Sequence, residues 1–235
     1  MKKSLFTLAL TALSLAAAAQ TAPAVARPAA TAAATPAGYA ELMTQAIADI
    51  TSAADATQLQ ALAARMEHAA AVAPADWLPR YYQAYALTMS VFRSKEDGAA
   101  KDRTLDQAEA ALALARQLKG DESELLVLQA YVYQARLMVA PSERGQEYSE
   151  LVDGAVAQAK ALNPANPRTY LVAANNLYYT PSEYGGGAAA ARPLYEAAKV
   201  RFAAFRPAGP LAPNWGQGQV LARLKQYDAP VQAAK

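Results

Sequence analysis

The residue types that carry most enzymatic and metal chemistry are scarce in this 235-residue chain, which has no cysteine and one histidine, His68. A thiol nucleophile is therefore excluded. A histidine-based metal site or catalytic triad is nearly excluded, because such sites combine histidine with further histidine, cysteine, serine or carboxylate side chains in a set geometry. No serine stands in a Gly-x-Ser-x-Gly turn, and carboxylates such as Glu41 and Glu150 are scattered as on solvated helix faces. We expect no catalytic residue, no metal, no cofactor and no enzyme activity.

A glycine-rich stretch from Pro181 to Gly187 precedes a predicted helix and is the most distinctive motif. The N–H groups at a helix start can hold an anion when a glycine-rich turn brings them together. A phosphate-binding loop also needs a lysine and a hydroxyl after its last glycine, whereas Ala188 and Ala189 follow here. We interpret the stretch as a tight turn between packed helices, and nucleotide binding is not supported.

Residues 1–37 are predicted to precede the folded domain. Lys2 and Lys3 are followed by a short apolar run that ends in alanines before Gln20, a pattern typical of a secretory signal peptide at residues 1–19. Residues 20–37 are almost entirely alanine, threonine and proline, which predicts a disordered linker. Residues 38–235 remain for one repeat domain. We expect an exported protein, periplasmic or secreted, that is soluble after cleavage and has no transmembrane segment in its mature form.

The charge balance argues against nucleic acid as a partner. The chain has 22 basic and 20 acidic residues, and the signal peptide accounts for two of the lysines, so the mature protein is near neutral. Nucleic-acid binding depends on basic residues that neutralise phosphates. The sequence contains no dense basic cluster, which argues against nucleic acid as a partner.

Helix-forming residues and regularly spaced breakers predict an all-α repeat protein. Alanine, leucine, glutamine, glutamate and arginine dominate after residue 38, and all favour helices. Pro74, Gly120, Pro164 and Pro207 recur at spacings of 46, 44 and 43 residues, within the range of periods that marks repeat arrays. Each period holds a tyrosine-rich helix A and an alanine-rich helix B. The A helices are expected at about 76–92, 122–139 and 166–179, the B helices at about 57–72, 104–118, 148–162 and 193–205, and a first helix at 38–53.

This pattern resembles the tetratricopeptide repeat (TPR) in degenerate form. Small residues at Ala84, Ala130 and Ala174 fall where the two helices of each family repeat touch, although Arg80 and Gln83 stand where large apolar residues are usual. The resemblance implies an α-solenoid of three to four antiparallel helix pairs. It places the residues in excess of the family's shorter repeat in loops between helices A and B, at about 93–103, 141–147 and 180–192.

The third of these loops should end close to Pro193, because proline is well tolerated in the first turn of a helix. The helix that contains Pro193 should therefore begin no earlier than about Ala190. Trp215, which follows three prolines, is expected either to start the last helix or to cap the array, and we favour a capping role over contact with a ligand.

In the TPR family, helix A lines a concave groove that binds partners, and the resemblance transfers that role to residues of three repeats. The predicted binding residues are Tyr81, Tyr85, Tyr131, Gln134, Asn175 and Tyr178, with Tyr184 at the rim. Tyrosine and asparagine suit peptide recognition because they offer both surface and hydrogen bonds. Any single tyrosine is also a good core residue, and that alternative stays open.

The resemblance implies a non-enzymatic scaffold for an unidentified protein or peptide in the periplasm or cell envelope. An alternative comes from the Gly-Gly turn ahead of an alanine-led helix, which is similar to a turn in TPR proteins attached to TRAP-type solute transporters. That likeness implies a small-ligand-binding accessory of a transporter, similar to the T-component of that system.

Cleavage of the predicted signal peptide is directly testable. The mature protein should begin near Gln20, because the small residues before it match the site that signal peptidase reads. Intact-mass spectrometry of the protein from an extracytoplasmic fraction measures this. A recovered mass that still includes Met1 to Ala19 would contradict export by cleavage.

Overall fold

The computed structural model describes residues 36–229, and every regular element in that range is helical. The predicted all-α fold class is therefore confirmed. The signal peptide predicted at 1–19 and nearly all of the linker predicted at 20–37 lie outside the described residues, as does 230–235. No helix between residues 36 and 229 is both long and apolar enough to cross a membrane.

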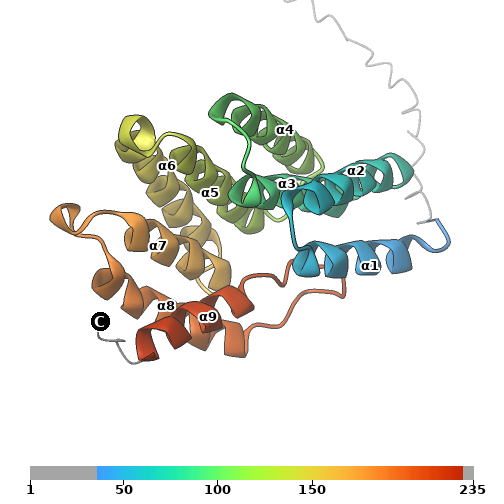
Figure 1. Ribbon diagram of the computed structural model, residues 1–235. Helices are drawn as coiled ribbons and strands as arrows, with labels where there is room; N and C mark the ends of the chain where they lie inside the picture. The colour runs from blue at the N-terminus through green and yellow to red at the C-terminus, as the bar shows by residue number, and fades with distance from the viewer. Residues whose placement is uncertain (1–35, 230–235) are drawn as a thin grey trace, which may run out of the picture. The chain divides into compact units, whose positions relative to one another are not determined.

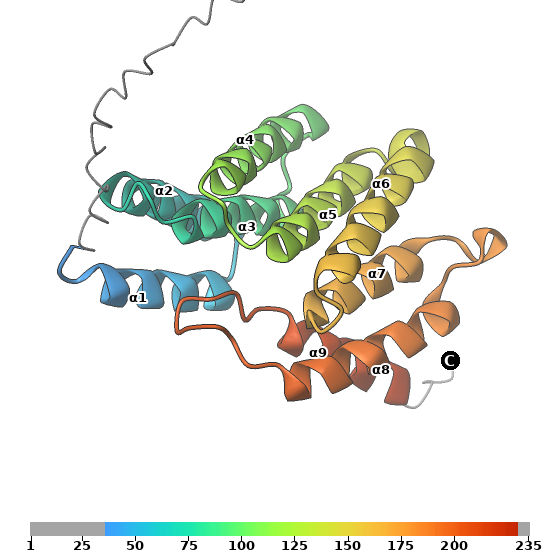
Figure 2. The ribbon, with the colours of Figure 1, turned by 180° about the vertical axis from the view of Figure 1, so that it is seen from behind.

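Consecutive helices pack side by side in pairs, and α9 follows the last pair (Figures 1 and 2). The elements are α1 (Tyr39–Ser52), α2 (Ala56–Val72), α3 (Leu78–Arg93), α4 (Gly98–Gln117), α5 (Glu122–Val139), α6 (Pro141–Leu162), α7 (Pro167–Tyr179), the short 3₁₀ helix η1 (Ser182–Tyr184), α8 (Ala188–Ala204) and α9 (Gln217–Asp228). The tyrosine-rich A helices α3, α5 and α7 also contact one another from repeat to repeat. The described residues thus form an array of helix pairs in which the A helices share one face.

Local sequence signals set the helix boundaries. Asp55, Asp97, Asp121 and Asn166 each accept a hydrogen bond from a backbone N–H in the first turn of α2, α4, α5 and α7. Such side chains satisfy N–H groups that have no partner inside the helix. The four breakers used to find the period all fall just after the end of α2, α4, α6 or α8.

The predicted loops between helices A and B are wrong in the first two repeats. Helix α4 begins at Gly98, and α6 begins at Pro141 directly after α5. The extra residues of those repeats therefore lengthen the B helices. Pro141 starts its helix because proline fits the first helical position, where its missing N–H costs nothing.

The third loop is present, but its end was also predicted incorrectly. Helix α8 begins at Ala188, so Pro193 lies inside the helix and not in its first turn. Four alanines precede Arg192 and favour helix strongly enough to add this turn. The carbonyl that Pro193 leaves without a helical donor belongs to Ala189, which is exposed and can be satisfied by water.

The segment between α8 and α9 crosses the shared face of the A helices. In both ribbon views it runs from the end of α8 toward α1 and then returns to α9 (Figures 1 and 2). Tyr82 donates a hydrogen bond to the carbonyl of Leu211, 3.0 Å between the oxygens. Trp215 stacks between the rings of Tyr85 and Tyr131, with centroid distances of 4.7 and 5.4 Å. The segment between α8 and α9 therefore occupies the groove that the sequence predicted along the A helices.

A buried ion pair lies beneath this aromatic stack. Arg168 of α7 donates to both carboxylate oxygens of Glu124 on α5, and both residues are buried. Asn166 donates to the same carboxylate at 2.9 Å. Tyr81 donates to Glu124 at 3.3 Å and accepts the indole N–H of Trp215 at 2.8 Å. The network joins α3, α5, α7 and the C-terminal segment.

Replacement of Trp215 tests whether the C-terminal segment is part of the core. Trp215→Ala should lower the free energy of unfolding by about 3–5 kcal/mol, since truncation of a buried aromatic loses its contacts and leaves a cavity. Urea denaturation measures the change. Leu221→Ala on the exposed side of α9 is the matched control and should stay within about 0.5 kcal/mol. Equal effects of the two changes would contradict the filled groove.

Candidate functional site

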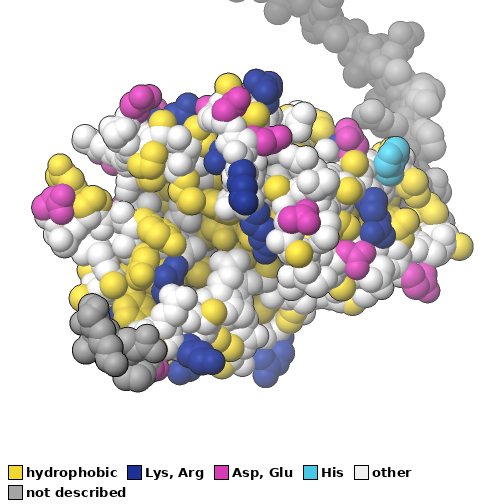
Figure 3. Space-filling model, in the orientation of Figure 1, with side chains coloured by type: hydrophobic (Ala, Val, Ile, Leu, Met, Phe, Trp, Pro, Cys, Tyr) yellow, Lys and Arg dark blue, Asp and Glu magenta, His cyan; other side chains and the backbone are white. Residues whose placement is uncertain are grey.

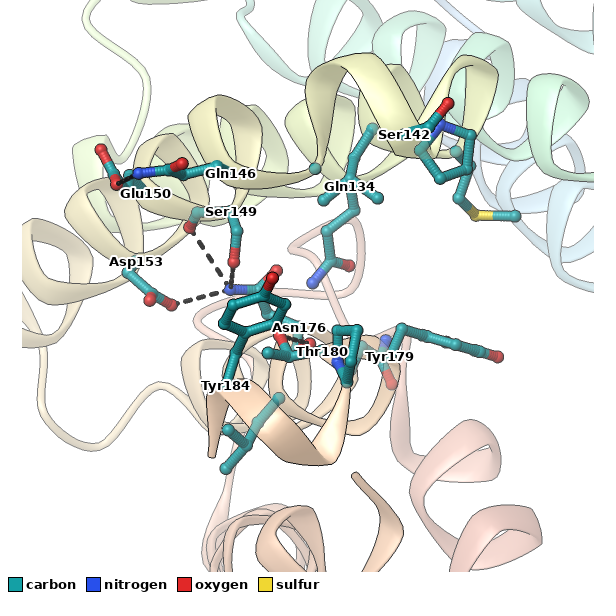
Figure 4. A pocket seen from close by; sticks show the side chains of 17 residues that line it. Gln134, Ser142, Gln146, Ser149, Glu150, Asp153, Asn176, Tyr179, Thr180 and Tyr184 are labelled. Atoms are coloured by element: carbon teal, nitrogen blue, oxygen red, sulfur yellow. Dashed lines mark hydrogen bonds between the residues drawn. The ribbon is translucent and has the colours of Figure 1, made fainter. Parts of the chain in front are cut away.

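A cleft of about 800 Å³ opens between α5 and α6 on one side and α7 with η1 on the other (Figure 4). Its size lies within the usual range for small-molecule sites. The lining residues are Gln134, Leu137, Met138, Pro141, Ser142, Gly145, Gln146, Ser149, Glu150, Asp153, Asn175, Asn176, Leu177, Tyr179, Thr180, Pro181 and Tyr184. This cleft is our candidate binding site.

The floor of the cleft is a polar tie between α6 and α7. The side-chain amide of Asn176 donates to the Ser149 hydroxyl at 3.0 Å and to the Asp153 carboxylate at 2.9 Å, the contacts drawn in Figure 4. Gln134 donates from its amide to the carbonyl of Val172 at 2.7 Å and so joins α5 to α7. Both amides are buried, so their hydrogen bonds are costly to break. They therefore tie α5 and α6 to α7 and fix the spacing of the cleft walls.

The mouth of the cleft is unusually apolar for a surface. Met138, Tyr179 and Tyr184 line it and are 54%, 66% and 78% exposed. Figure 3 shows hydrophobic side chains gathered in a hollow over α5, α6 and α7, with Lys and Arg side chains near its edges. Large exposed apolar groups clustered in a concavity mark a binding surface more often than scattered ones do.

A cation stands next to the exposed phenol of Tyr179. Arg223 of α9 donates from Nη2 to the Tyr179 hydroxyl at 3.1 Å. The same guanidinium lies over the Tyr178 ring, 4.0 Å from its centroid, and donates from Nη1 to Gln226 at 2.9 Å. Arg223 is thus held in one place at the edge of the cleft.

The structure divides the seven predicted binding residues into two groups. Gln134, Asn175 and Tyr184 line the cleft, and the half-buried Tyr178 lies behind Tyr179 against Arg223.

Tyr81, Tyr85 and Tyr131 are at most 5% exposed and lie under the C-terminal segment. Burial raises the pKa of Tyr131 to about 12, and it also raises the pKa of Tyr81 and of Tyr85 above the usual value of a phenol. Their burial agrees with the alternative that these tyrosines are core residues. A binding role for any of the seven stays a prediction.

Sequence reasoning missed Met138, Tyr179 and Arg223 as cleft or cleft-edge residues, and of the Asn175–Asn176 pair it named only Asn175 as a binding residue. The Asn175–Asn176 pair was a usable signal, because asparagine disfavours helix interiors. The position of Arg223 could not be found, since it depends on how α9 lies against α7 after the irregular segment.

Comparison with known proteins identifies one related solved structure. No protein-family model and no curated protein sequence matches the chain. The HusA haemophore from Porphyromonas gingivalis superposes with a TM-score of 0.73 at 36% sequence identity, over 85% of this chain and 98% of that chain. The chain therefore belongs to the same family as HusA. That relative is named for carrying haem, which is a binding activity and not catalysis.

The polar tie at the floor can be tested by mutation. Asn176→Ala should cost about 1–3 kcal/mol of stability, because it removes the hydrogen bonds that its buried amide donates to α6, one of them to a carboxylate. Thermal unfolding measures this change. Gln146→Ala removes an exposed amide from the same cleft wall and should change stability by less than about 0.5 kcal/mol. An Asn176→Ala variant as stable as this control would show that the tie does not hold α6 to α7.

Proposed function

We propose that this protein is an exported, non-enzymatic carrier that binds haem in the cleft between α5, α6 and α7. The observation that carries the proposal is the relationship to HusA, 36% identical over 98% of that haemophore's chain. The predicted signal peptide supports export. Haem is the cargo here, so no reaction is required of the protein.

The lining of the cleft suits a flat apolar molecule with an acidic edge. Leu137, Met138 and Leu177 provide apolar walls, and Tyr179 and Tyr184 add aromatic rings at the mouth. Such rings can stack on a conjugated macrocycle. The acidic edge could meet Arg223, whose guanidinium has five N–H donors, more than its contacts with Tyr179 and Gln226 use.

The cleft also offers groups that can hold haem iron. Proteins hold this iron with histidine, cysteine, methionine or tyrosine. The chain has no cysteine, and its one histidine, His68, is exposed on α2 and does not line the cleft. Met138, Tyr179 and Tyr184 do line it. The residues present therefore fit the proposed cargo.

The peptide-scaffold hypothesis fits the geometry less well. The groove that would hold a peptide is filled by Trp215 and its flanking segment. The transporter-accessory hypothesis, like the haem-carrier proposal, assumes a small ligand, but nothing in residues 36–229 points to a transporter. We therefore place the ligand in the neighbouring cleft.

Titration with ferric haem tests the proposal. The protein should show a saturable shift of the haem Soret band, with one haem bound per chain. Gly145→Phe should weaken binding at least about tenfold, which is about 1.4 kcal/mol. Gly145 lines the cleft, and a Cβ there would meet nothing within 4 Å, so the ring would occupy the ligand's space.

The matched control is Gly154→Phe. Gly154 lies on the same helix α6, has equally open space, and does not line the cleft. Both changes remove a helical glycine, so neither should lower helix stability. Absence of saturable binding by the unmodified protein would refute the function, and equal binding by the two variants would refute the location.

A further inference from the structure

We propose that a groove between α2 and α4 is a second binding site, which takes the main chain of a short extended peptide and holds its carboxylate at Arg80. The α2–α4 groove has a volume of about 490 Å³. It is lined by residues of α2, α3 and α4, none of which lines the cleft proposed for haem. The second site is therefore independent of the proposed function.

Helix α3 forms the floor of the α2–α4 groove. It packs closely against α2 and against α4, which do not pack closely against each other (Figures 1 and 2). Gln60, Ala64 and Glu67 line the groove from α2, at spacings of four and three residues that share one helix face. Ala110 and Ala111 line it from α4. The small alanine side chains leave room for a peptide to lie along both walls.

The next space along the array, between α4 and α6, is instead closed by ion pairs. Arg136 of α5 donates to Glu109 of α4 at 2.8 Å, and Arg144 of α6 donates to Asp102 of α4 at 2.8 Å. The ion pairs of α2 go to α1 and α3, and among the described residues none goes to α4. The α2–α4 groove is therefore left open to a ligand.

A buried amide on the floor of this groove has a donor without a protein acceptor. Gln83 is 9% exposed, and its Oε1 accepts a hydrogen bond from Nη1 of Arg80 at 2.8 Å. A guanidinium can only donate, so this bond turns the NH₂ group of Gln83 away from Arg80. In residues 36–229 that NH₂ group has no acceptor, and protein does not enclose it, so it opens into the groove. Buried donors are normally paired, and a ligand carbonyl in the groove would supply the acceptor.

Glutamines from three helices face the α2–α4 groove. Gln60 stands on the α2 wall and Gln107 on the α4 wall, with Gln83 between them on α3. A primary amide offers both a donor and an acceptor, which is the pair of groups that each peptide unit needs to satisfy. The lining contains no aromatic ring that could stack on a flat ligand. These groups favour a peptide main chain over a conjugated molecule such as haem.

Arg80 gives the groove a charged end. It is the first lining residue of α3, and its Nη1 lies 3.9 Å from Oε1 of Glu67, the last lining residue of α2. Glu67 is exposed and held only loosely at this distance, so it can move aside. A guanidinium binds a carboxylate through two parallel N–H donors. The carboxylate of a bound peptide would therefore lie at Arg80, with its main-chain amides along the glutamines.

NMR titration of the mature protein with N-acetyl-tetraalanine tests the proposal, because this peptide offers little besides main chain and a carboxylate. The side-chain amide signals of Gln83 should shift saturably. The C-terminal amide of the same peptide should bind about tenfold more weakly, since it lacks the charge that pairs with Arg80. N-acetyl-tetraproline keeps the carboxylate but has no N–H groups, and it should also bind about tenfold more weakly.

Variants on each helix face locate the site. Ala64→Phe should weaken tetraalanine binding at least about tenfold, because the ring would occupy the groove. Ala61→Phe is the matched control, since Ala61 is also exposed on α2 but does not line the groove. Gln83→Met removes the donor at similar volume and should weaken binding of the peptide about tenfold. Arg80→Gln should abolish the preference for the acid over the C-terminal amide.

Each arm can contradict the proposal. Absence of saturable shifts with tetraalanine would overturn it, and equal binding of tetraproline would show that a carboxylate alone is recognised. Equal effects of Ala64→Phe and Ala61→Phe would place the peptide elsewhere. Haem titration of both variants should match the unmodified protein, because no residue of α2 lines the cleft. Failure of the peptide site and failure of the proposed haem function are thus separate outcomes.

Discussion

The stacking of Trp215 between Tyr85 and Tyr131 is the contact on which the arrangement of the C-terminal part depends. The two tyrosines belong to different repeats, so the indole sets the spacing of α3 and α5 as well as closing the groove. Helix α9 starts directly afterward at Gln217, and at its N-cap, Gly216, φ is +106° and a Cβ would lie 2.7 Å from Leu171. Only glycine accepts both conditions easily. The direction of α9, and hence the position of Arg223, follows from this contact.

The buried pair of Arg168 and Glu124 makes the filling of the groove specific. Such pairs add little net stability because desolvation offsets their attraction, while loss of one partner is costly. Here the pair orients the side chains that surround it. Glu124 also accepts from Asn166 and Tyr81, and the Arg168 guanidinium lies 4.7 Å from the Phe205 ring centroid and 5.8 Å from that of Trp215. An apolar residue in place of Trp215 could fill the space but could not donate to Tyr81.

Local chemistry made most of the fold predictable, whereas the site depended on packing that no local pattern encodes. Breakers and N-cap residues act within a few positions, so the period and most helix ends could be read from the sequence. Among the predicted binding residues, Gln134 of α5, Asn175 of α7 and Tyr184 of η1 line the cleft. The burial of the groove tyrosines was open to sequence reasoning only as an alternative, because the residue that covers them is 84 positions beyond Tyr131, at Trp215.

The open cleft is the counterpart of the filled groove. Because the C-terminal segment covers the A helices near their N-terminal halves, the surface left uncovered lies toward their C-terminal ends, at Met138 on α5 and Tyr179 on α7. The early start of α6 at Pro141 adds a wall there. The glycine turn adds the rim: Gly187 donates to the Leu177 carbonyl at 2.9 Å, and a Cβ at Gly186 would overlap the carbonyl oxygen of Thr180. The filled groove and the open cleft thus belong to the same array of helix pairs, one at each end of the A helices.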